Sequence, residues 1–405
     1  MREKSRGINE HISPGRLVIP SLAISGASME PPGIVTSLLL IEIAATFGFN
    51  VGVGGQIRTA ASTVGIISAL AMGALSVRFD YKSLLTAGLG AFAVSALGCT
   101  IAPNFGSILF FFSISGLAGA MVGPMTNSLV GELLPLEKRS SAIGTLFAAR
   151  AFTYLAGAQI IGYIGGLWGW RMAFIAFVFP ISVLSLLTAL RGLPIGIRAR
   201  SSGDKERNYV EGFKCVFTSR SPFACLFGTA LSSAAWGGIL TYSASFFRQR
   251  YLMPRTQASI LLSGVALCFM VSTYLGGRLV NRFGRKPLTT LSVLVFSLFT
   301  IAVTNSPNMV MALVAMLLTS AFSAVRRTAI FSLTLEQVPG FRGTMMSLNA
   351  AFYSLGGALG SGLGGLALLL YDWGVVGLSL GVIGLAAAVI VQLIVVDPTR
   401  YSVDK

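Results

Sequence analysis

The sequence predicts an all-α membrane protein in which twelve transmembrane helices form two pseudo-symmetric bundles of six. Of its 405 residues, 54% are hydrophobic and only 11% are charged, whereas soluble proteins average about 25% charged residues. Its mean hydropathy is +0.77. The apolar residues lie in runs long enough to cross a hydrocarbon core about 30 Å thick.

One long polar connection separates six apolar runs from six more. The expected spans are 17–40, 55–77, 83–101, 107–130, 142–164 and 171–190, then 222–246, 259–279, 287–304, 309–333, 344–370 and 374–396. We therefore expect an N-terminal tail at 1–16, a bundle at 17–190, a linker at 191–220, a bundle at 221–397 and a C-terminal tail at 398–405.

The first span, Leu17 to Leu40, carries an acid in its middle, Glu30, followed by Pro31 and Pro32. A charge at this depth costs about 2.5–3.5 kcal/mol on insertion scales, which favours a carboxylate that faces a cavity or is protonated. The prolines remove backbone donors and bend the helix. The alternative is a kinked packing helix whose acid is neutral and hydrogen-bonded to a neighbour.

The net charge of +16 comes from basic residues in short loops between apolar runs. This placement predicts contact with the lipid bilayer and excludes a nucleic-acid partner. Most of the basic residues fall on the side of the linker, so both termini are expected to be cytoplasmic and the protein to lie in the cell membrane. The four cysteines lack metal-site spacing and the single His11 has no partner, so we expect no metal, no cofactor and no enzyme activity.

Two segments of the first half recur in the second at an offset of 204 residues. The stretch GALSVRFDYK (73–82) is repeated as GRLVNRFGRK (277–286), and ELLPLEKR (132–139) as EQVPGFR (336–342). Six spans return the chain to its starting side, so the two copies have the same orientation and are related by an axis along the membrane normal.

These loops give the chain its resemblance to the major facilitator superfamily, over essentially the whole length. The family's signature loop is matched in the second half except that Asn281 replaces the usual acid, while in the first half Val77 and Asp80 replace the acid and the second glycine. Glu30 before Pro31 resembles the first helix of the drug/proton antiporter-like efflux permeases. The resemblance implies alternating access, with the loops as gates; the candidate gating residues are Gly73, Arg78, Asp80, Glu132, Arg139, Gly277, Arg282, Gly284, Arg285, Lys286, Glu336 and Arg342. The alternative is that these loops only anchor the topology.

Four charged residues are expected well inside the spans: Glu30, Arg150, Arg326 and Arg327. Intramembrane charges indicate functional sites and have partners. At least one of Arg326 and Arg327 is expected in a cavity, and the alternative for both is a structural pair. A pocket for substrate and proton would add polar and aromatic side chains, namely Trp236, Tyr242, Asn127, Gln159, Asn349 and Tyr353.

The resulting functional prediction is a secondary transporter that binds a small molecule between the halves, most simply a proton-coupled exporter of amphipathic or drug-like molecules. Protonation of Glu30 would couple transport to the ion, and no second copy is needed, so we expect a monomer. One alternative is uptake or facilitated transport of a small organic anion by the intramembrane arginines. Another is a receptor or scaffold that transports nothing.

Overall fold

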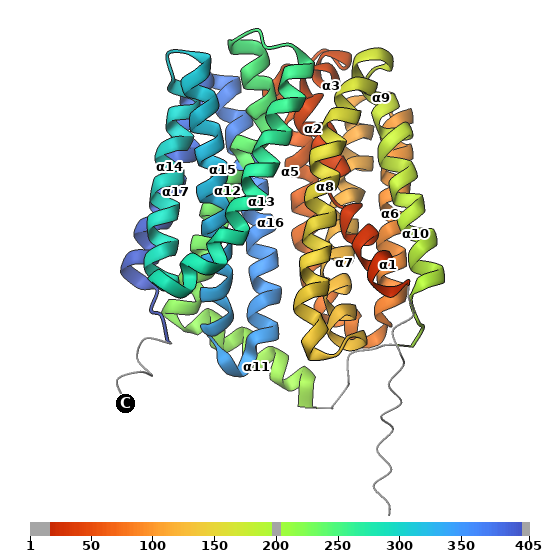
Figure 1. Ribbon diagram of the computed structural model, residues 1–405, viewed down its shortest axis with the longest axis vertical. Helices are drawn as coiled ribbons and strands as arrows, with labels where there is room; N and C mark the ends of the chain where they lie inside the picture. Colours follow the sequence, from red (N-terminus) through yellow and green to blue (C-terminus); the bar gives the residue numbers. More distant parts are fainter. Residues whose placement is uncertain (1–16, 197–203, 399–405) are drawn as a thin grey trace, which may run out of the picture.

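A computed structural model describes residues 17–196 and 204–398, so the predicted tails and part of the linker lie outside the described residues. Side chains are also left undescribed at 73–74, 76–77, 136–137, 140, 204–210 and 342–343. Figure 1 shows two helical bundles side by side, with α11 at one end and α3 and α9 at the other. We call the end that carries α11 the linker face, and the opposite end the far face.

The first bundle comprises α1 (Val18–Ala27), α2 (Pro31–Leu38), α3 (Leu40–Thr46), α4 (Val51–Gly54), α5 (Gln56–Arg78), α6 (Tyr81–Ile101), α7 (Phe105–Leu133), α8 (Leu136–Trp168), α9 (Trp170–Ala173) and α10 (Phe179–Gly192). A π-helical turn, Phe174–Val178, joins α9 to α10. The second comprises α12 (Arg220–Arg250), α13 (Arg255–Phe283), α14 (Arg285–Asn305), α15 (Met309–Glu336), α16 (Arg342–Leu370) and α17 (Trp373–Ile394), preceded by α11 (Asp204–Thr218). A short 3-10 turn, Pro339–Phe341, precedes α16.

Nine helices in the described ranges are long and apolar enough to cross a membrane, and a bent pair, Val18–Leu38 with Leu40–Thr46, makes a tenth. The other two of the twelve columns are α5 and α8, which have 23 and 33 residues. Each of these two columns carries an arginine within it, Arg58 in α5 and Arg150 in α8. The predicted architecture of twelve helices in two bundles is confirmed.

The first column is broken where the prolines predict. Pro31 and Pro32 are the first two residues of α2. The backbone before them forms a tighter turn, in which the amides of Met29 and Glu30 donate to the carbonyls three residues earlier, at 3.3 and 3.2 Å. A second break, at Leu39, bends α3 away from α2 by 66°. Glu30 therefore stands at the helix start that the prolines create.

The two signature loops differ in backbone conformation. In the second, Gly284 has φ +85°, a left-handed conformation that favours glycine. In the first, Asp80 has φ −71° and caps α6, accepting hydrogen bonds from the amide and hydroxyl of Ser83 at 3.1 and 2.7 Å. The first loop has Asp80 where the second has Gly284, and its backbone at this position is extended instead of left-handed.

Lys82, the last residue of the first signature loop, fastens two helices together. Its side chain is 8% exposed, and Nζ donates to the carbonyls of Leu190 and Leu193 at 2.7 and 2.6 Å. These carbonyls belong to the C-terminal end of α10, where a cation is favoured.

We expect Lys82→Met to lower the free energy of unfolding by about 1–3 kcal/mol, because it leaves two buried carbonyls without their charged donor. Thermal unfolding of the purified protein in detergent measures the loss. The control is Lys286→Met at the equivalent position of the second half, where the side chain is half-buried. An equal loss in both variants would contradict the role assigned to Lys82.

Candidate functional site

Glu30 and Arg150 form a salt bridge within the first bundle. Nε and Nη2 of Arg150 lie 2.7 and 2.6 Å from Oε1 of Glu30. The side chain of Arg150 is 28% exposed and that of Glu30 is 21% exposed, so neither is fully buried in the protein core. The stem of Arg150 runs past Gly26 of α1, where an added Cβ would lie 3.8 Å from it. The sequence named both residues as candidates; the structure adds that they are partners.

Arg58 of α5 is a further intramembrane charge, so the expectation of only four such residues is wrong. Its Nη1 donates to the carbonyl of Gly33 at 3.1 Å and to Oγ1 of Thr36 at 3.4 Å. Both acceptors belong to α2, just after Glu30, and Arg58 interacts electrostatically with Glu30. Its position, only three residues after the predicted start of the second span, made it look like a helix-end anchor.

Tyr353 of α16 brings the second bundle to this cluster. The guanidinium of Arg327 lies 5.0 Å from the centre of its ring. Tyr353 also interacts electrostatically with Arg326, Arg150 and Glu30. The charge cluster, defined as Glu30, Arg58, Arg150, Arg326 and Arg327, thus holds four guanidinium groups and one carboxylate.

Arg326 and Arg327 point in different directions, as adjacent helical residues must. Arg327 is half-buried beside Tyr353. Arg326 is only 1% exposed, with Nη1 donating to Oγ of Ser232 at 2.7 Å. Its guanidinium lies 5.6 Å from the ring centre of Phe296 on α14. The sequence alone left open which of the two arginines faces inward, and the structure places Arg326 inside the second bundle.

The remaining candidates for the pocket fall into two groups. Gln159 joins the halves, because it donates to Ser263 at 2.9 Å and accepts from Ser259 at 3.1 Å. Tyr242 also lies near the first half, at Gly55, and donates to the carbonyl of Ser361 at 2.7 Å. The others do not join the cluster: Trp236 stacks on Phe269 with ring centres 5.6 Å apart, Asn349 accepts from Thr229 at 3.2 Å, and Asn127 is exposed on α7.

The gating candidates lie at the linker face, at the ends of their helices. Arg139 donates to the carbonyl of Leu134 at 2.9 Å, and Arg282 lies 5.4 Å from the ring centre of Phe283. Glu132 and Arg78 are exposed, Gly277 has open space around it, Lys286 is half-buried, and Arg285 and Glu336 both have partners. Gly73 lies within α5, and the side chain of Arg342 lies outside what the structure describes.

A second charged group, which the sequence did not reveal, joins the halves at the far face. Glu42 of α3 accepts hydrogen bonds from Arg248 at 2.9 and 2.6 Å and from Arg255 at 3.0 and 2.6 Å. Arg248 also donates to the carbonyl of Leu38 at 3.0 Å, and Arg255 to that of Gly165 at 2.9 Å. We call Glu42, Arg248 and Arg255 the far-face latch. Glu42 lies just past the predicted end of the first span, where an acid looks like an ordinary loop residue.

A contact between two hydroxyl groups and a close approach of two backbones accompany the latch between the halves. Oγ1 of Thr59 lies 2.9 Å from Oγ of Ser361. A Cβ added to Gly52 would lie 2.6 Å from the carbonyl oxygen of Gly365, so only glycine permits this approach. The hydrogen bonds and salt bridges of the latch, like the contact of Thr59 with Ser361, lie toward the far face, so the two halves are closed against each other there.

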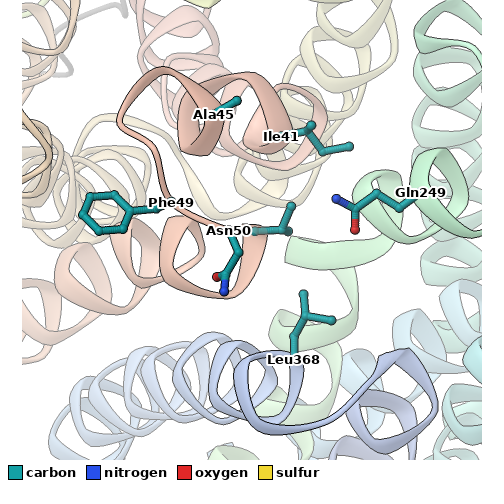
Figure 2. A pocket seen from close by; sticks show the side chains of 7 residues that line it. Ile41, Ala45, Phe49, Asn50, Gln249 and Leu368 are labelled. Atoms are coloured by element: carbon teal, nitrogen blue, oxygen red, sulfur yellow. The ribbon is translucent and has the colours of Figure 1, made fainter.

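Two depressions border the latch at the far face. One, of about 340 Å³, lies between α3, α4, α12 and α16. Figure 2 shows Ile41, Gln249 and Leu368 extending into it from three of these helices. The other, of about 600 Å³, is lined by Ile41, Gln249 and the latch residues Arg248 and Arg255, among others. Each depression includes residues of both bundles, so movement of one bundle against the other would change its shape.

The match to a family model decides what this architecture belongs to. The model of the Major Facilitator Superfamily matches residues 22–254 and 225–405. The chain belongs to the Major Facilitator Superfamily. Among curated relatives, Multidrug resistance protein 2 of Bacillus subtilis (strain 168) is 25% identical over 71% of this chain and 73% of its own length. Inner membrane transport protein YdhP of Escherichia coli (strain K12) is 22% identical over 86% of this chain and 87% of its own.

Solved structures of other proteins share this fold over nearly the whole chain. A mutant of the nucleoside transporter NupG has a TM-score of 0.77 at 13% identity, covering 93% of this chain and 98% of its own. The D-xylose-proton symporter also has a TM-score of 0.77, at 17% identity, covering 94% and 98%. At such identities the likeness shows the fold alone. The family shows that the chain is a multi-pass membrane protein and a secondary transporter of a small molecule, and it is not an enzyme.

Proposed function

We propose that this superfamily member cotransports a proton with a small organic anion. The charge cluster supports this proposal, because Arg150 pairs with the single carboxylate, Glu30, while Arg58 and Arg327 add two more guanidinium groups near the boundary between the bundles. Such an excess of positive charge attracts an anion and repels a cation. Arg150 and Arg58 in the first bundle, with Arg327 beside Tyr353 in the second, would hold the solute between the halves.

Glu30 sets the sign of the coupling. While it is ionised, it occupies Arg150 through two contacts, at 2.6 and 2.7 Å. Protonation removes the charge of the carboxylate and releases the guanidinium for the anion. Proton and anion therefore bind together, which is the condition for cotransport, whereas a cationic solute would compete with the proton and give exchange.

We further propose that the protein works as a monomer in the cell membrane with both termini in the cytoplasm. The Lys and Arg residues on the linker face support this orientation. The linker face is then cytoplasmic, and closure at the far face makes this the inward-facing state of an alternating-access cycle.

Proton and solute fluxes in proteoliposomes test the proposal. In the wild-type protein a pH gradient, acidic outside, is expected to drive accumulation of small carboxylates with net proton uptake. We expect Glu30→Gln to lose at least about tenfold of the gradient-driven accumulation while keeping downhill anion flux, because the amide leaves Arg150 free without carrying a proton. Glu211→Gln, at an exposed position in α11, is the matched control and should behave as wild type.

Arg150→Met should abolish the anion flux itself, since it removes the guanidinium that protonation of Glu30 releases. If Arg150→Met accumulates carboxylates as the wild-type protein does, the role assigned to Arg150 is contradicted. Wild-type proteoliposomes that move no carboxylate would refute anion transport.

A second candidate function is efflux of amphipathic or drug-like molecules in exchange for protons. It is favoured by the similarity to Multidrug resistance protein 2 and by the partial exposure of Glu30. Lipophilic cations that drive proton release in the same proteoliposomes, with the release abolished by Glu30→Gln, would establish exchange and replace the cotransport proposal.

A further inference from the structure

Arg326 presents an unused hydrogen-bonding edge inside the second bundle. Its side chain is 1% exposed, and Nη1 is taken by Ser232. The other two nitrogens, Nε and Nη2, are buried and have no hydrogen-bond partner. These two N–H groups lie on the same edge of the planar guanidinium, from which they can donate to both oxygens of a carboxylate or to a single small anion.

The charge of Arg326 is also uncompensated. The salt bridges among the described residues give it no carboxylate, and the nearest charged neighbour in the chain is Arg327, which repels it. Phe296 offers only the weak attraction of a ring face. A buried cation without a partner is costly, so this position favours the arrival of negative charge.

A hydroxyl donor lies on the same face of the helix. Ser323 precedes Arg326 by three residues on α15, so the two side chains project from one side. Ser323 is fully buried, and its Oγ has no hydrogen-bond partner. Ser232 cannot serve as this donor, since its hydroxyl is already given to the carbonyl of Gly228 at 2.6 Å.

We propose that the Nε/Nη2 edge of Arg326, with the hydroxyl of Ser323, binds a small monovalent anion within the second bundle. The ligand is either a free halide ion or the carboxylate of a solute, because both accept hydrogen bonds and carry one negative charge. Packing between α12, α14 and α15 limits the anion to a small size. The site uses neither Glu30 nor Arg150. The proposed anion site can therefore be refuted without refuting the proposed cotransport, and the reverse also holds.

Thermal unfolding of the purified protein in detergent tests the site. The sodium salts compared are chloride, bromide, formate and acetate, with the bulky buffer anion HEPES as reference, all at one sodium concentration. A ligand that binds only the folded state raises Tm in a saturable way. We expect at least one small anion to raise the wild-type Tm above the HEPES value, and Arg326→Met to show no rise.

Arg171→Met is the matched control, because it removes a half-buried arginine that already donates to the carbonyls of Thr100 and Ala102, and it should keep the anion-dependent rise. Ser323→Ala should shift the half-saturating anion concentration upward. A rise with halides alone identifies a free inorganic ion as the ligand, and a rise with formate or acetate alone identifies a carboxylate. No rise with any small anion, or an equal rise in Arg326→Met, overturns the proposal.

A measurement on the wild-type protein covers the case in which Arg326→Met does not fold. If halides produce the rise in Tm, crystals grown in bromide are expected to show anomalous scattering beside the Nε/Nη2 edge of Arg326. Anomalous peaks elsewhere and none at this edge would refute halide binding there.

Discussion

Gly55→Ala is expected to hold the two halves apart at the far face. Gly55 joins α4 to α5, and a Cβ added there would overlap the hydroxyl and ring of Tyr242 from the second bundle. The ring cannot move away, because Gly364 and Gly365 of α16 lie against it. Overpacking of this kind costs about 1–3 kcal/mol, which corresponds to about a 5- to 150-fold shift of the conformational equilibrium toward the far-face-open state.

Spin labels at Phe49 and Leu252, one in each half and 44% and 84% exposed, measure this opening by electron double resonance in a variant without its partly buried cysteines, Cys215 and Cys268. The distance distribution should move to longer values in Gly55→Ala. The matched control is Gly90→Ala on α6, where an added Cβ has open space. An unchanged distance distribution in Gly55→Ala would show that closure of the far face does not require a glycine opposite Tyr242.

Glu42→Gln is expected to open the same face by a different route. The substitution keeps the shape of the side chain but removes the charge that holds Arg248 and Arg255, whose side chains are only 14% and 26% exposed. Breaking a fully buried pair costs about 2–5 kcal/mol, and partial exposure reduces this to about 1–3 kcal/mol. The equilibrium should therefore shift by about 5- to 150-fold toward the far-face-open state.

The same spin-label pair reads out this variant. Asp372→Asn is its control: Asp372 is also an acid at the far face, but it accepts from the amide of Val375 as the cap of α17, a role that asparagine fills equally well. If the distances in Glu42→Gln match those of the wild type, the charge of Glu42 is not needed to keep the far face closed.

Much of the fold could be predicted from the sequence because long apolar runs leave few alternatives in a bilayer. The prolines after Glu30 marked the break in the first column, and the repeat at an offset of 204 residues indicated two bundles of one orientation. These are local signals, or comparisons of one segment with another. Neither requires knowledge of how the two bundles meet.

The partners in the site could not be predicted in the same way. Depth in the membrane singled out Glu30 and Arg150, but their pairing depends on how α8 packs against the start of α2. Glu42 and its two arginines are more than 200 residues apart, and each appears in the sequence as an ordinary residue at a helix end. Arg58 was missed because hydropathy assigned it to the edge of a span, whereas the bend at Leu39 and the break at Pro31 place it beside α2.

The bent first column also fixes the length of one short segment. Glu30 directly precedes α2 and Glu42 lies in α3, so a single stretch of thirteen residues, 30–42, carries both an acid of the charge cluster and the acid of the far-face latch. One inserted residue would rotate either acid by about 100° relative to the other and move it by about 1.5 Å along the axis. Natural variants of this transporter can therefore carry other side chains at the positions between Glu30 and Glu42, but they are expected to keep the number of residues between these two acids. A relative with an insertion or deletion in this segment is expected to have a different gate.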